Sequence, residues 1–379
     1  MKPIEYGMFI MPFHDADKPL AVGYDEDLEL IVRAEELGFT DFWIGEHHTL
    51  KYETIVMPEM FIARALGETS RIRMGPSPVC LNQHHPAHVA SRLAFLDHLS
   101  KGRLNLCIAP SSVTADQELY GVDPAKGGEM VEESWKMIQE LWSSDPPYHL
   151  DGKYWKIHVE KYCDEETLIG YIHKPYQRPH PPVSMAGTSR NSYSMKTAGR
   201  FGYAPIAAAL IAANVVADNW QTYAEAAEQS GRTPDRNDFS ICRTIFLADT
   251  TAEAEQRVRT NSLGKLFQYV CRIFDKGLGR KILKRDLDMP DSECNLDYLM
   301  TEQIIAGDVD EVLRRLMVMR EETGDFGKLI LMSFDWDDKQ SWVHSMELFA
   351  NELMPALNRE VGAVATEEGA AETSIEQRK

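Results

Sequence analysis

The sequence has no long apolar run, no paired cysteines and no excess of basic residues. Its longest apolar stretch, YAPIAAALIAANVVA at 203–217, is shorter than the roughly 20 residues that a membrane-spanning helix needs. The six cysteines form no CxxC pair, which is typical of reduced thiols in a cytosolic protein. With 59 acidic and 40 basic residues and a formal net charge of -19, the chain is unsuited to binding nucleic acid or an anionic membrane. The amino terminus, MKPIEYGMFIMPF, has no signal-peptide pattern, so we expect a cytoplasmic protein.

Several cofactor and metal motifs are also missing. No GxGxxG follows a predicted strand, since GLG at 277–279 lacks the third glycine, and there is no Walker loop. A nicotinamide-binding Rossmann unit is therefore unsupported. No HxH closes the first predicted strand, where barrel metallohydrolases usually begin their metal site. His84 and His88 have the i, i+4 spacing of a helical zinc pair, but Pro86 between them marks a helix start, so we expect no metal site.

What the sequence does contain is a regular alternation of strand and helix patterns. The strands are almost wholly apolar, as in a parallel sheet that is covered on both faces. We predict strands at 4–11, 40–48, 72–81, 103–110, 182–187, 203–206, 238–248 and 328–334. We predict helices at 24–38, 58–70, 86–102, 129–142, 190–200, 220–231, 251–264, 308–323 and 341–357. Eight strand-helix units predict an α/β protein with a (β/α)8 TIM barrel.

The barrel is expected to form one domain over residues 1–361 with two insertions. The first insertion, 146–181, alternates polar and aromatic residues around a DG turn, which predicts a hairpin. The second, 265–300, contains FQYVCRIF and the basic run KGLGRKILKRD. The tail, 362–379, is rich in small and charged residues and is expected to be disordered.

The stretch FWIGEHH at 42–48 is an apolar run that ends in Glu46, His47 and His48. Three adjacent ionisable groups at the end of a buried strand are costly to place unless something uses them. Active groups of a (β/α)8 barrel lie at the carboxyl ends of the strands, so we expect these three side chains at the barrel mouth. The same rim should carry the 75–79 segment, APSS at 109–112 and GTSRNS at 187–192.

The stretch GPSPVCLNQHHPAH at 75–88 ends the third predicted strand with two prolines. Proline removes a ladder hydrogen bond, so Pro78 must lie at the strand end or bulge away from it. A cis bond before Pro78 would give a kinked surface on which a flat ring could lean, and a plain loop proline is the alternative interpretation. His85 and His88 flank Pro86 at a helix start, where an exposed or capping histidine is the commoner outcome.

The stretch VSMAGTSRNSYSMKTAG at 183–199 passes from a strand through a hydroxyl-rich turn into a helix. The hydroxyls of Thr188, Ser189, Ser192 and Ser194, with the free N–H groups of a helix start, suit a phosphate. Arg190 within the turn favours this interpretation, and ordinary N-capping is the alternative. A barrel mouth with an anion site and histidines, but without a metal set, suggests a phosphorylated cofactor.

These stretches resemble the bacterial-luciferase-like flavin monooxygenases. The likeness rests on EHH at 46–48, NQHHPAHVASRLAFLDHLSKGRLNLCIA at 82–109 and the turn after the fifth predicted strand. Within that superfamily, 223–254 and 191–200 are most similar to the diketocamphane monooxygenase branch. The likeness runs in order and spacing from residue 4 to about 357, and HP…LD.LS.GR is its most specific part.

The resemblance implies a TIM barrel that binds FMN as FMNH2, supplied by a separate NAD(P)H-flavin reductase. It implies that His47, beside Glu46, is the active-site histidine, and that Ser77 and Pro78 are joined by a cis peptide that supports the flavin ring. It places Ala109 and Ser111 where the fourth strand meets the flavin. The implied phosphate site comprises Gly187, Thr188, Ser189, Arg190, Ser192 and Ser194.

The chain departs from the family at one point. Many relatives have a glycine-rich or Cys-Arg sequence where this chain has Ala109-Pro110-Ser111. The phosphate-binding arginine expected there is absent, which leaves Arg190 as its candidate substitute.

The resemblance also implies a reaction. Bound FMNH2 would react with O2 to give a flavin C4a-(hydro)peroxide that oxygenates a small apolar substrate such as a ketone, an aldehyde or a terpenoid-like molecule. His47 is suited to set the protonation state of that species. The inferred lining residues, Phe9, Met11, Trp43 and Met185, offer few polar handles, although such residues are more often core.

Some alternatives remain at this point. The 265–300 insertion is a candidate lid, with a dimer contact or ordinary packing as alternatives, and we expect a homodimer. A deazaflavin-dependent oxidoreductase would share the barrel and the anion site. A noncatalytic partner subunit of a luciferase-type heterodimer is a further alternative, although the retention of His47 with Glu46 speaks against it. A metal-dependent barrel hydrolase is the third.

Overall fold

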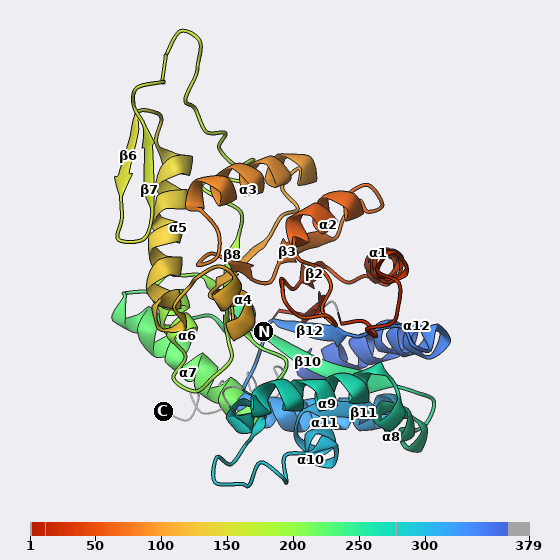
Figure 1. Cartoon of the computed structure of the whole chain (residues 1–379). Coiled ribbons are helices and arrows are strands. Elements are labelled where there is room, and N and C mark those ends of the chain that lie inside the picture. Colours follow the sequence, from red (N-terminus) through yellow and green to blue (C-terminus); the bar gives the residue numbers. More distant parts are fainter. Residues whose placement is uncertain (1, 12, 277–278, 363–379) are drawn as a thin grey trace, which may run out of the picture. The chain divides into compact units, whose positions relative to one another are not determined.

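The computed structural model describes residues 2–11, 13–276 and 279–362. The chain divides into two compact units, each assembled from separate stretches (Figure 1). Unit 1 comprises Met1–Phe9, Arg33–Thr40 and Gly187–Lys379, and unit 2 comprises Ile10–Val32 and Asp41–Ala186. One domain over residues 1–361 stays a prediction, and the tail from residue 363 lies outside the described residues.

Short, buried, parallel strands form the centre of unit 2. Strand β2 (Asp41–Ile44) pairs with β3 (Arg73–Pro76), and β5 (Leu106–Ala109) pairs with β4 (Val79–Cys80) and with β8 (Val183–Gly187). Every residue of β2, β4 and β5 is buried, as expected for parallel strands that are covered on both faces.

One glycine of unit 2 is required by a close approach of the backbone. A Cβ atom on Gly75, in β3, would lie 2.5 Å from the carbonyl oxygen of Asn105 and 2.8 Å from the ring of Trp43. Only glycine fits at that distance. The backbone and side chains around β3 are therefore packed tightly, just before Ser77 and Pro78 follow the strand.

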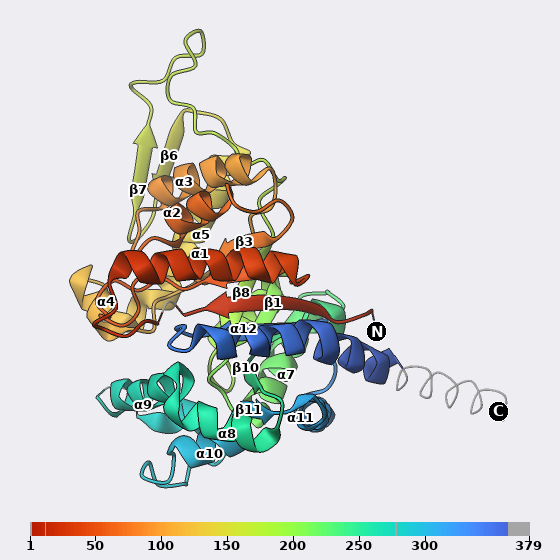
Figure 2. The ribbon, with the colours of Figure 1, turned by 90° about the vertical axis from the view of Figure 1, so that its right-hand side faces the viewer.

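The helices of unit 2 flank its strands (Figure 1). They are α2 (Pro58–Ala65), α3 (Pro86–Ser100), α4 (Thr114–Leu119) and α5 (Gly127–Ser143), with a short 3-10 turn at Pro124–Lys126 before α5. The first insertion forms the predicted antiparallel hairpin of β6 (Tyr148–Asp151) and β7 (Lys156–Val159). Figure 2 shows the segment that follows β7 projecting beyond α3.

The longest strand of unit 1 is β10 (Ser240–Leu247), and all of its residues are buried. Its first half pairs in parallel with β9 (Ala204–Ala207) and β12 (Lys328–Ser333), and its second half pairs with β11 (Ile304–Gly307). Strand β1 (Glu5–Ile10) follows β12 in the sheet order. We did not predict β11, which occupies the short apolar stretch IIAG between the second insertion and the next helix.

Helices connect these strands in unit 1. They are α6 (Tyr193–Phe201), α7 (Ala213–Gln229), α8 (Thr251–Thr260), α9 (Ser262–Asp275), α10 (Leu296–Glu302), α11 (Val309–Thr323) and α12 (Lys339–Leu348). Single turns lie at Arg236–Asp238, Arg280–Leu283 and Phe349–Leu353. Helix α1 (Leu20–Glu36) divides between the two units.

The order of strands and helices is that of a (β/α)8 barrel, as predicted. Several boundaries were wrong: the predicted strand at 72–81 is interrupted after Pro76, the predicted helix at 58–70 ends at Ala65, and α7 begins at Ala213 rather than at 220. The predicted helix at 251–264 is divided into α8 and α9. We also missed α4 (Thr114–Leu119). No helix in the described part of the chain combines the length and apolar character that crossing a membrane requires.

Candidate active site

Glu46, His47 and His48 follow β2, and they enter two different groups of side chains within unit 2. His47 lies between the carboxylates of Glu53 and Asp116, and we call these three residues the His47 cluster. Glu46 lies between the rings of His48 and His84, and we call these three the Glu46 cluster. Neighbours in sequence therefore serve different sites.

The His47 cluster holds one imidazole between two buried acids. Nδ1 of His47 lies 3.2 Å from Oδ2 of Asp116 in a hydrogen bond, and Nε2 lies 3.2 Å from Oε2 of Glu53 in an ion-pair contact. The side chains of Glu53 and Asp116 are 2% and 1% exposed, whereas that of His47 is 17% exposed. Both ring nitrogens of His47 therefore face hydrogen-bond acceptors, which favours the doubly protonated imidazole.

Asp116 is fixed by donors other than His47. It comes from the first turn of α4, and its Oδ1 accepts hydrogen bonds from the N–H and the hydroxyl of Thr49 at 2.8 and 2.5 Å. Oδ1 also accepts from the N–H of His48 at 3.2 Å. The loop after β2 is thus tied to α4 through one carboxylate.

The electrostatics of the His47 cluster follow from burial and charge. Burial by itself would lower the pKa of His47, but the charges of Glu53 and Asp116 outweigh it, and the pKa is raised. Burial raises the pKa of Glu53 against the opposing attraction of His47. For Asp116 burial is outweighed by the hydrogen bonds from His47 and Thr49, which lower its pKa to about 2.

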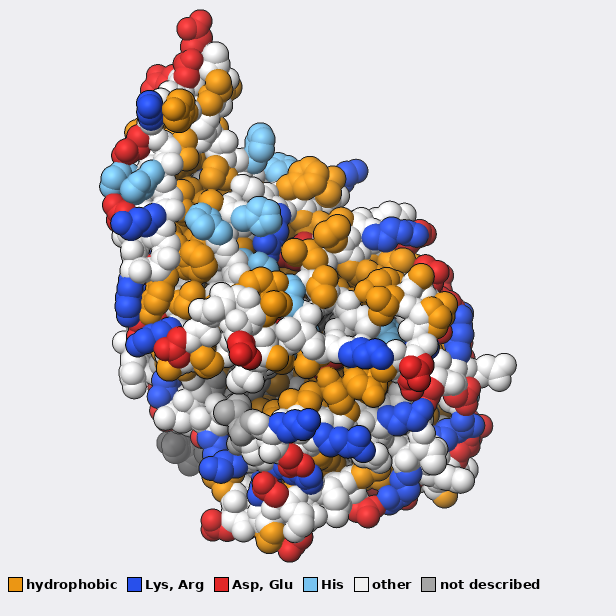
Figure 3. Space-filling model, viewed as in Figure 1, with side chains coloured by type: hydrophobic (Ala, Val, Ile, Leu, Met, Phe, Trp, Pro, Cys, Tyr) orange, Lys and Arg blue, Asp and Glu red, His pale blue; other side chains and the backbone are white. Residues whose placement is uncertain are grey.

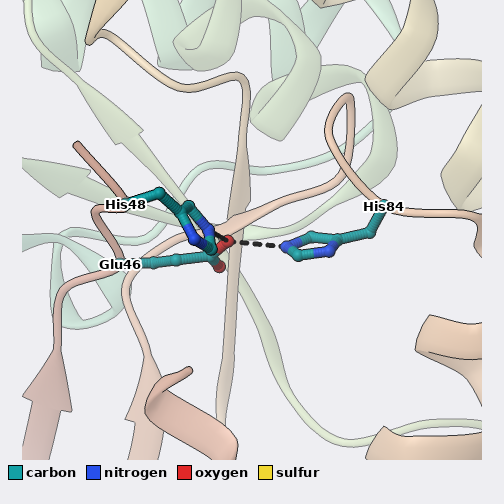
Figure 4. A group of neighbouring side chains, drawn as sticks. All are labelled: Glu46, His48 and His84. Carbon is teal, nitrogen blue, oxygen red and sulfur yellow. Dashed lines mark hydrogen bonds and ion pairs between the residues drawn. The ribbon is translucent and has the colours of Figure 1, made fainter. Parts of the chain in front are cut away.

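In the Glu46 cluster, two imidazoles share one carboxylate oxygen. Figure 4 shows both rings directed at Glu46, whose Oε1 accepts from Nε2 of His84 at 2.6 Å and from Nε2 of His48 at 3.2 Å. Oε2 accepts from the N–H of Cys80 at 3.3 Å. Burial by itself would raise the pKa of Glu46, but these hydrogen bonds lower it to about 2. The hydroxyl of Tyr120 lies 3.0 Å from Nδ1 of His48.

The residues proposed to contact a flavin ring also lie in unit 2, after β3 and β5. Ser77 and Pro78 are joined by a cis peptide bond, as the family resemblance implied, and both side chains are half-buried. Ala109 ends β5, and Ser111 is buried with its N–H donating to Oδ1 of Asn82 at 3.3 Å.

Buried amide groups near Ser111 have unused hydrogen-bonding capacity. Among the described residues, Nδ2 of Asn82, both amide atoms of Gln83 and Oε1 of Gln117 have no hydrogen-bond partner. The amide nitrogen of Gln117 donates to the carbonyl of Ser111 at 2.5 Å. Unpaired buried polar groups call for an explanation, and a ligand with a polar edge supplies one, so these residues fit a flavin ring.

The turn after β8 belongs to unit 1 and carries the remaining predicted residues. Ser192 is the N-cap of α6 and accepts from the N–H of Met195 at 3.5 Å, so the capping alternative is correct for this residue. Thr188 and Ser189 are exposed, and Ser194 is half-buried. The hydroxyls of the two exposed residues and the start of α6 are the groups available to a phosphate.

Side chains of α7 shape this turn. Nδ2 of Asn219 donates to the carbonyl of Ser189 at 2.8 Å, and a Cβ atom on Gly187 would lie 1.8 Å from Oδ1 of Asn219. The carboxylate of Asp218 accepts from the N–H of Asn191 at 2.6 Å. Glycine at 187 is therefore needed for Asn219 to hold the turn.

Part of the guanidinium group of Arg190 forms a hydrogen bond within the protein. Its Nη2 donates to the carbonyl oxygen of Arg285 at 2.8 Å, and Nδ2 of Asn214 donates to the same oxygen at 3.1 Å. The side chain of Arg285 pairs with Glu302 and Glu322. Arg190 thus has a structural role that the sequence did not indicate.

The other histidines and the predicted lining residues have ordinary positions. His85 is the N-cap of α3, and Nδ1 of His88 lies 3.2 Å from Nη1 of Arg92. Trp43 and Met185 are 4% and 2% exposed, in agreement with the core alternative, while Phe9 and Met11 are half-buried. In the second insertion, Leu266 and Phe267 of α9 are fully buried, which supports the packing alternative there; a lid function stays a prediction.

Sequence reasoning missed Glu53, Asp116 and Tyr120, and it did not foresee the contact of His84 with Glu46. Asp116 lies 69 positions from His47, in a short helix that we did not predict. No local pattern links these residues, since only the fold brings them together.

Comparisons with known proteins place the chain in a family. The model of the family described as "Luciferase-like monooxygenase" matches residues 4–325. The chain is 29% identical to 4-hydroxyprotoasukamycin monooxygenase of Streptomyces nodosus subsp. asukaensis, covering 97% of this chain and 96% of that protein. It is 30% identical to 2,5-diketocamphane 1,2-monooxygenase 1 of Pseudomonas putida, covering 92% and 98%.

A solved structure gives the same result. The oxygenating constituent of 3,6-diketocamphane monooxygenase from Pseudomonas putida, a type II Baeyer-Villiger monooxygenase in complex with FMN, superimposes with a TM-score of 0.84 and 26% identity. The match covers 93% of this chain and 98% of that chain, which confirms the TIM-barrel fold. The chain therefore belongs to the luciferase-like monooxygenase family.

Proposed function

We propose that this chain is the oxygenase component of a two-component, FMN-dependent monooxygenase that acts on a small apolar organic substrate with O2. The observation that carries the proposal is the fixed position of His47 after β2, between the carboxylates of Glu53 and Asp116, in a chain of this family. A histidine held in one orientation by buried acids is suited to bind and orient a reacting polar group.

In this proposal one group of residues binds the flavin ring and another group binds the phosphate. Ser77, Pro78, Ala109 and Ser111 contact the ring, and the unpaired amide atoms near Ser111 bind its polar edge. The exposed hydroxyls of Thr188 and Ser189, with the start of α6 and Arg190, bind the phosphate. Reduced FMN supplies the two electrons that activate O2, and the protein supplies the binding, orientation and shielding from water.

A separate reductase is proposed to supply the reduced flavin. The related structure of the diketocamphane enzyme is named as an oxygenating constituent, which implies a second component in that system. No GxGxxG follows a strand of this chain, so we expect NAD(P)H to be oxidised elsewhere.

For the substrate we propose an apolar ketone, aldehyde or terpenoid-like molecule. Two of the similar proteins are named for diketocamphanes, which are bicyclic ketones with few polar groups. In this chain, the half-buried Phe9 and Met11 are the candidate apolar contacts.

The test is an oxygenation assay with reduced flavin supplied from outside. The protein is mixed with FMNH2 and isotopically labelled O2 in the presence of a panel of cyclic ketones and terpenes, and products are analysed by mass spectrometry. We expect one labelled oxygen atom in the product and no reaction when reduced deazaflavin replaces FMNH2. Reduction of a substrate by the reduced deazaflavin, without incorporation of oxygen, would refute the proposal.

A further inference from the structure

We propose that the Glu46 cluster is a binding site for a divalent transition-metal ion of the zinc class. The ligand atoms are Oε1 of Glu46, Nε2 of His48 and Nε2 of His84, which lie within 4.8 Å of one another. This proposal concerns metal binding alone and does not depend on the proposed oxygenase function.

The first argument is convergence. Figure 4 shows the rings of His48 and His84 approaching Glu46 from different sides, each with a nitrogen directed at the carboxylate. The Nε2 atoms of His84 and His48 lie 2.6 and 3.2 Å from the same oxygen, Oε1 of Glu46, so both nitrogens are directed at a common region. Convergent imidazole lone pairs are what a metal ion requires of its ligands.

The second argument is distance. Zinc binds nitrogen and oxygen at about 2.0–2.2 Å in a tetrahedron, which separates its ligand atoms by roughly 3.3 Å. The distance from Nε2 of His48 to Oε1 of Glu46 is already 3.2 Å. The distance from Nε2 of His84 to the same oxygen is 2.6 Å and must widen by about 0.7 Å. His84 lies at the end of a turn between β4 and α3, where such a shift is accessible.

The third argument is the set of partners behind the ligands. A histidine that binds a metal through one nitrogen usually donates its other N–H to an acceptor, and a ligating carboxylate is itself hydrogen-bonded. Nδ1 of His48 lies 3.0 Å from the hydroxyl of Tyr120. Oε2 of Glu46 accepts from the N–H of Cys80 at 3.3 Å, which leaves Oε1 for the metal.

Ligand chemistry and charge set the class of ion. Two imidazoles and one carboxylate suit Zn2+, Fe2+, Co2+ or Ni2+, whereas Ca2+ and Mg2+ require oxygen ligands. Three protein ligands leave a position for water. The side chain of Glu46 is fully buried, and those of both histidines are 10% exposed, so the ligands are shielded but the histidine edges reach the surface.

A second group in unit 2 provides an internal contrast. His149, Asp151 and His158 lie on the β6–β7 hairpin, where the two histidines face each other across the strands. Their rings are stacked at 4.2 Å with planes only 14° apart, and the Nε2 atoms of His149 and His158 lie 2.9 and 3.1 Å from the carboxylate of Asp151. The two histidine side chains are 57% and 41% exposed. Histidine side chains are visible on this part of the surface in Figure 3. The two histidines of the hairpin must therefore be replaced before any metal titration.

The experiment titrates the full chain in a His149→Ala/His158→Ala background. Zn2+ binding is measured by calorimetry, and Co2+ serves as a spectroscopic probe, because a four-coordinate site gives intense visible bands. We expect one Zn2+ ion per chain, a four-coordinate Co2+ spectrum, and displacement of Co2+ by Zn2+ but not by Mg2+.

Three further variants are made in that background. His84→Ala removes a ligand, and Tyr120→Phe removes only the partner of His48, which should weaken binding by about 10–100-fold. His84→Ala should weaken it by more than Tyr120→Phe. His88→Ala is the matched control, since this histidine faces Arg92 on the same segment, and it should bind Zn2+ as the background protein does.

Circular dichroism melts establish that each variant is folded. Absence of a four-coordinate Co2+ spectrum in the folded background protein would overturn the proposal. So would Zn2+ affinity that is unchanged by both His84→Ala and Tyr120→Phe. Because Tyr120 is 42% exposed, its replacement keeps the test valid even if His84→Ala does not fold.

Discussion

The loop after β2 and the turn after β8 both follow barrel strands, but their polar side chains differ in burial and in pairing. In the loop of unit 2, the ionisable side chains of the His47 and Glu46 clusters are mostly buried and bound to one another. In the turn of unit 1, Thr188 and Ser189 are exposed, and the backbone around them is held by Asn219 and Asp218.

This difference separates two requirements of a flavin enzyme. A group that controls a proton must be fixed before the reaction starts, because reorganisation at that moment raises the barrier. The donors of a phosphate site can be hydrated until the ligand binds, because the binding free energy comes from fixed N–H groups and a helix dipole. The loop is therefore expected to determine turnover, and the turn is expected to determine flavin affinity.

The largest expected effect comes from His47→Ala. Loss of a positioned acid-base group typically costs 10²–10⁴-fold in rate, so oxygenated product should fall by about 100-fold or more. The affinity for FMN should change little, because His47 is not among the residues proposed to bind the ring or the phosphate. Product is measured by mass spectrometry and affinity by flavin fluorescence. Equal losses of product and affinity would assign His47 a structural role.

Asp116→Asn tests whether the carboxylate that orients His47 matters as much as the imidazole. Asp116 accepts hydrogen bonds from His48 and Thr49 at Oδ1 and from His47 at Oδ2. In Asn one of these oxygens becomes an amide nitrogen, which cannot accept the hydrogen bond from His47 while the remaining oxygen accepts those from His48 and Thr49. We expect a loss of about 1–3 kcal/mol in the free energy of unfolding and a fall in product smaller than that for His47→Ala. Denaturant unfolding and the product assay measure the two effects. Asp123→Asn, at an exposed position, is the matched control.

The sequence was sufficient to predict most of the barrel strands, though not β11, because a buried parallel strand is almost continuously apolar. Strand β10, SICRTIFL, and the carboxyl end of β2 with its ionisable cluster were found in this way. It was not sufficient to predict the partners. Glu53 and Asp116 are common surface residue types in polar stretches, and nothing local in KYETIV or TADQEL indicates burial against His47.

The same limit applies to His84 and to Arg190. The sequence suggested only a comparison of His84 with His88 on a helix pattern, whereas the fold turns His84 toward Glu46, 38 positions away. Arg190 was expected to face a phosphate, and part of its guanidinium binds the carbonyl of Arg285, 95 positions away. Contacts at such separations are set by strand order, which single motifs do not encode.

Arg190→Met tests the turn as the site of flavin affinity. Hydrogen bonds to charged groups contribute about 1.5–3 kcal/mol, so the dissociation constant for FMN should rise by roughly tenfold or more. Riboflavin has no phosphate, and its dissociation constant should stay the same. Lys196→Met, on the exposed face of α6, removes a nearby cation as the control. An equal loss for FMN and riboflavin would show that Arg190 acts only through Arg285.

Gly187→Ala is expected to have the smallest effect on chemistry and to show whether the shape of the turn matters apart from its charges. The added Cβ would lie 1.8 Å from Oδ1 of Asn219, so Asn219 must move and release the carbonyl of Ser189. Overpacking of this kind typically costs about 1–3 kcal/mol in the free energy of unfolding, which thermal and denaturant unfolding would measure. FMN affinity should fall with little change in the product formed per flavin bound, because the His47 cluster belongs to unit 2. A fall in product at saturating FMN would mean that the turn also orients the ring. The assignment of turnover to the loop and of flavin affinity to the turn would then be wrong.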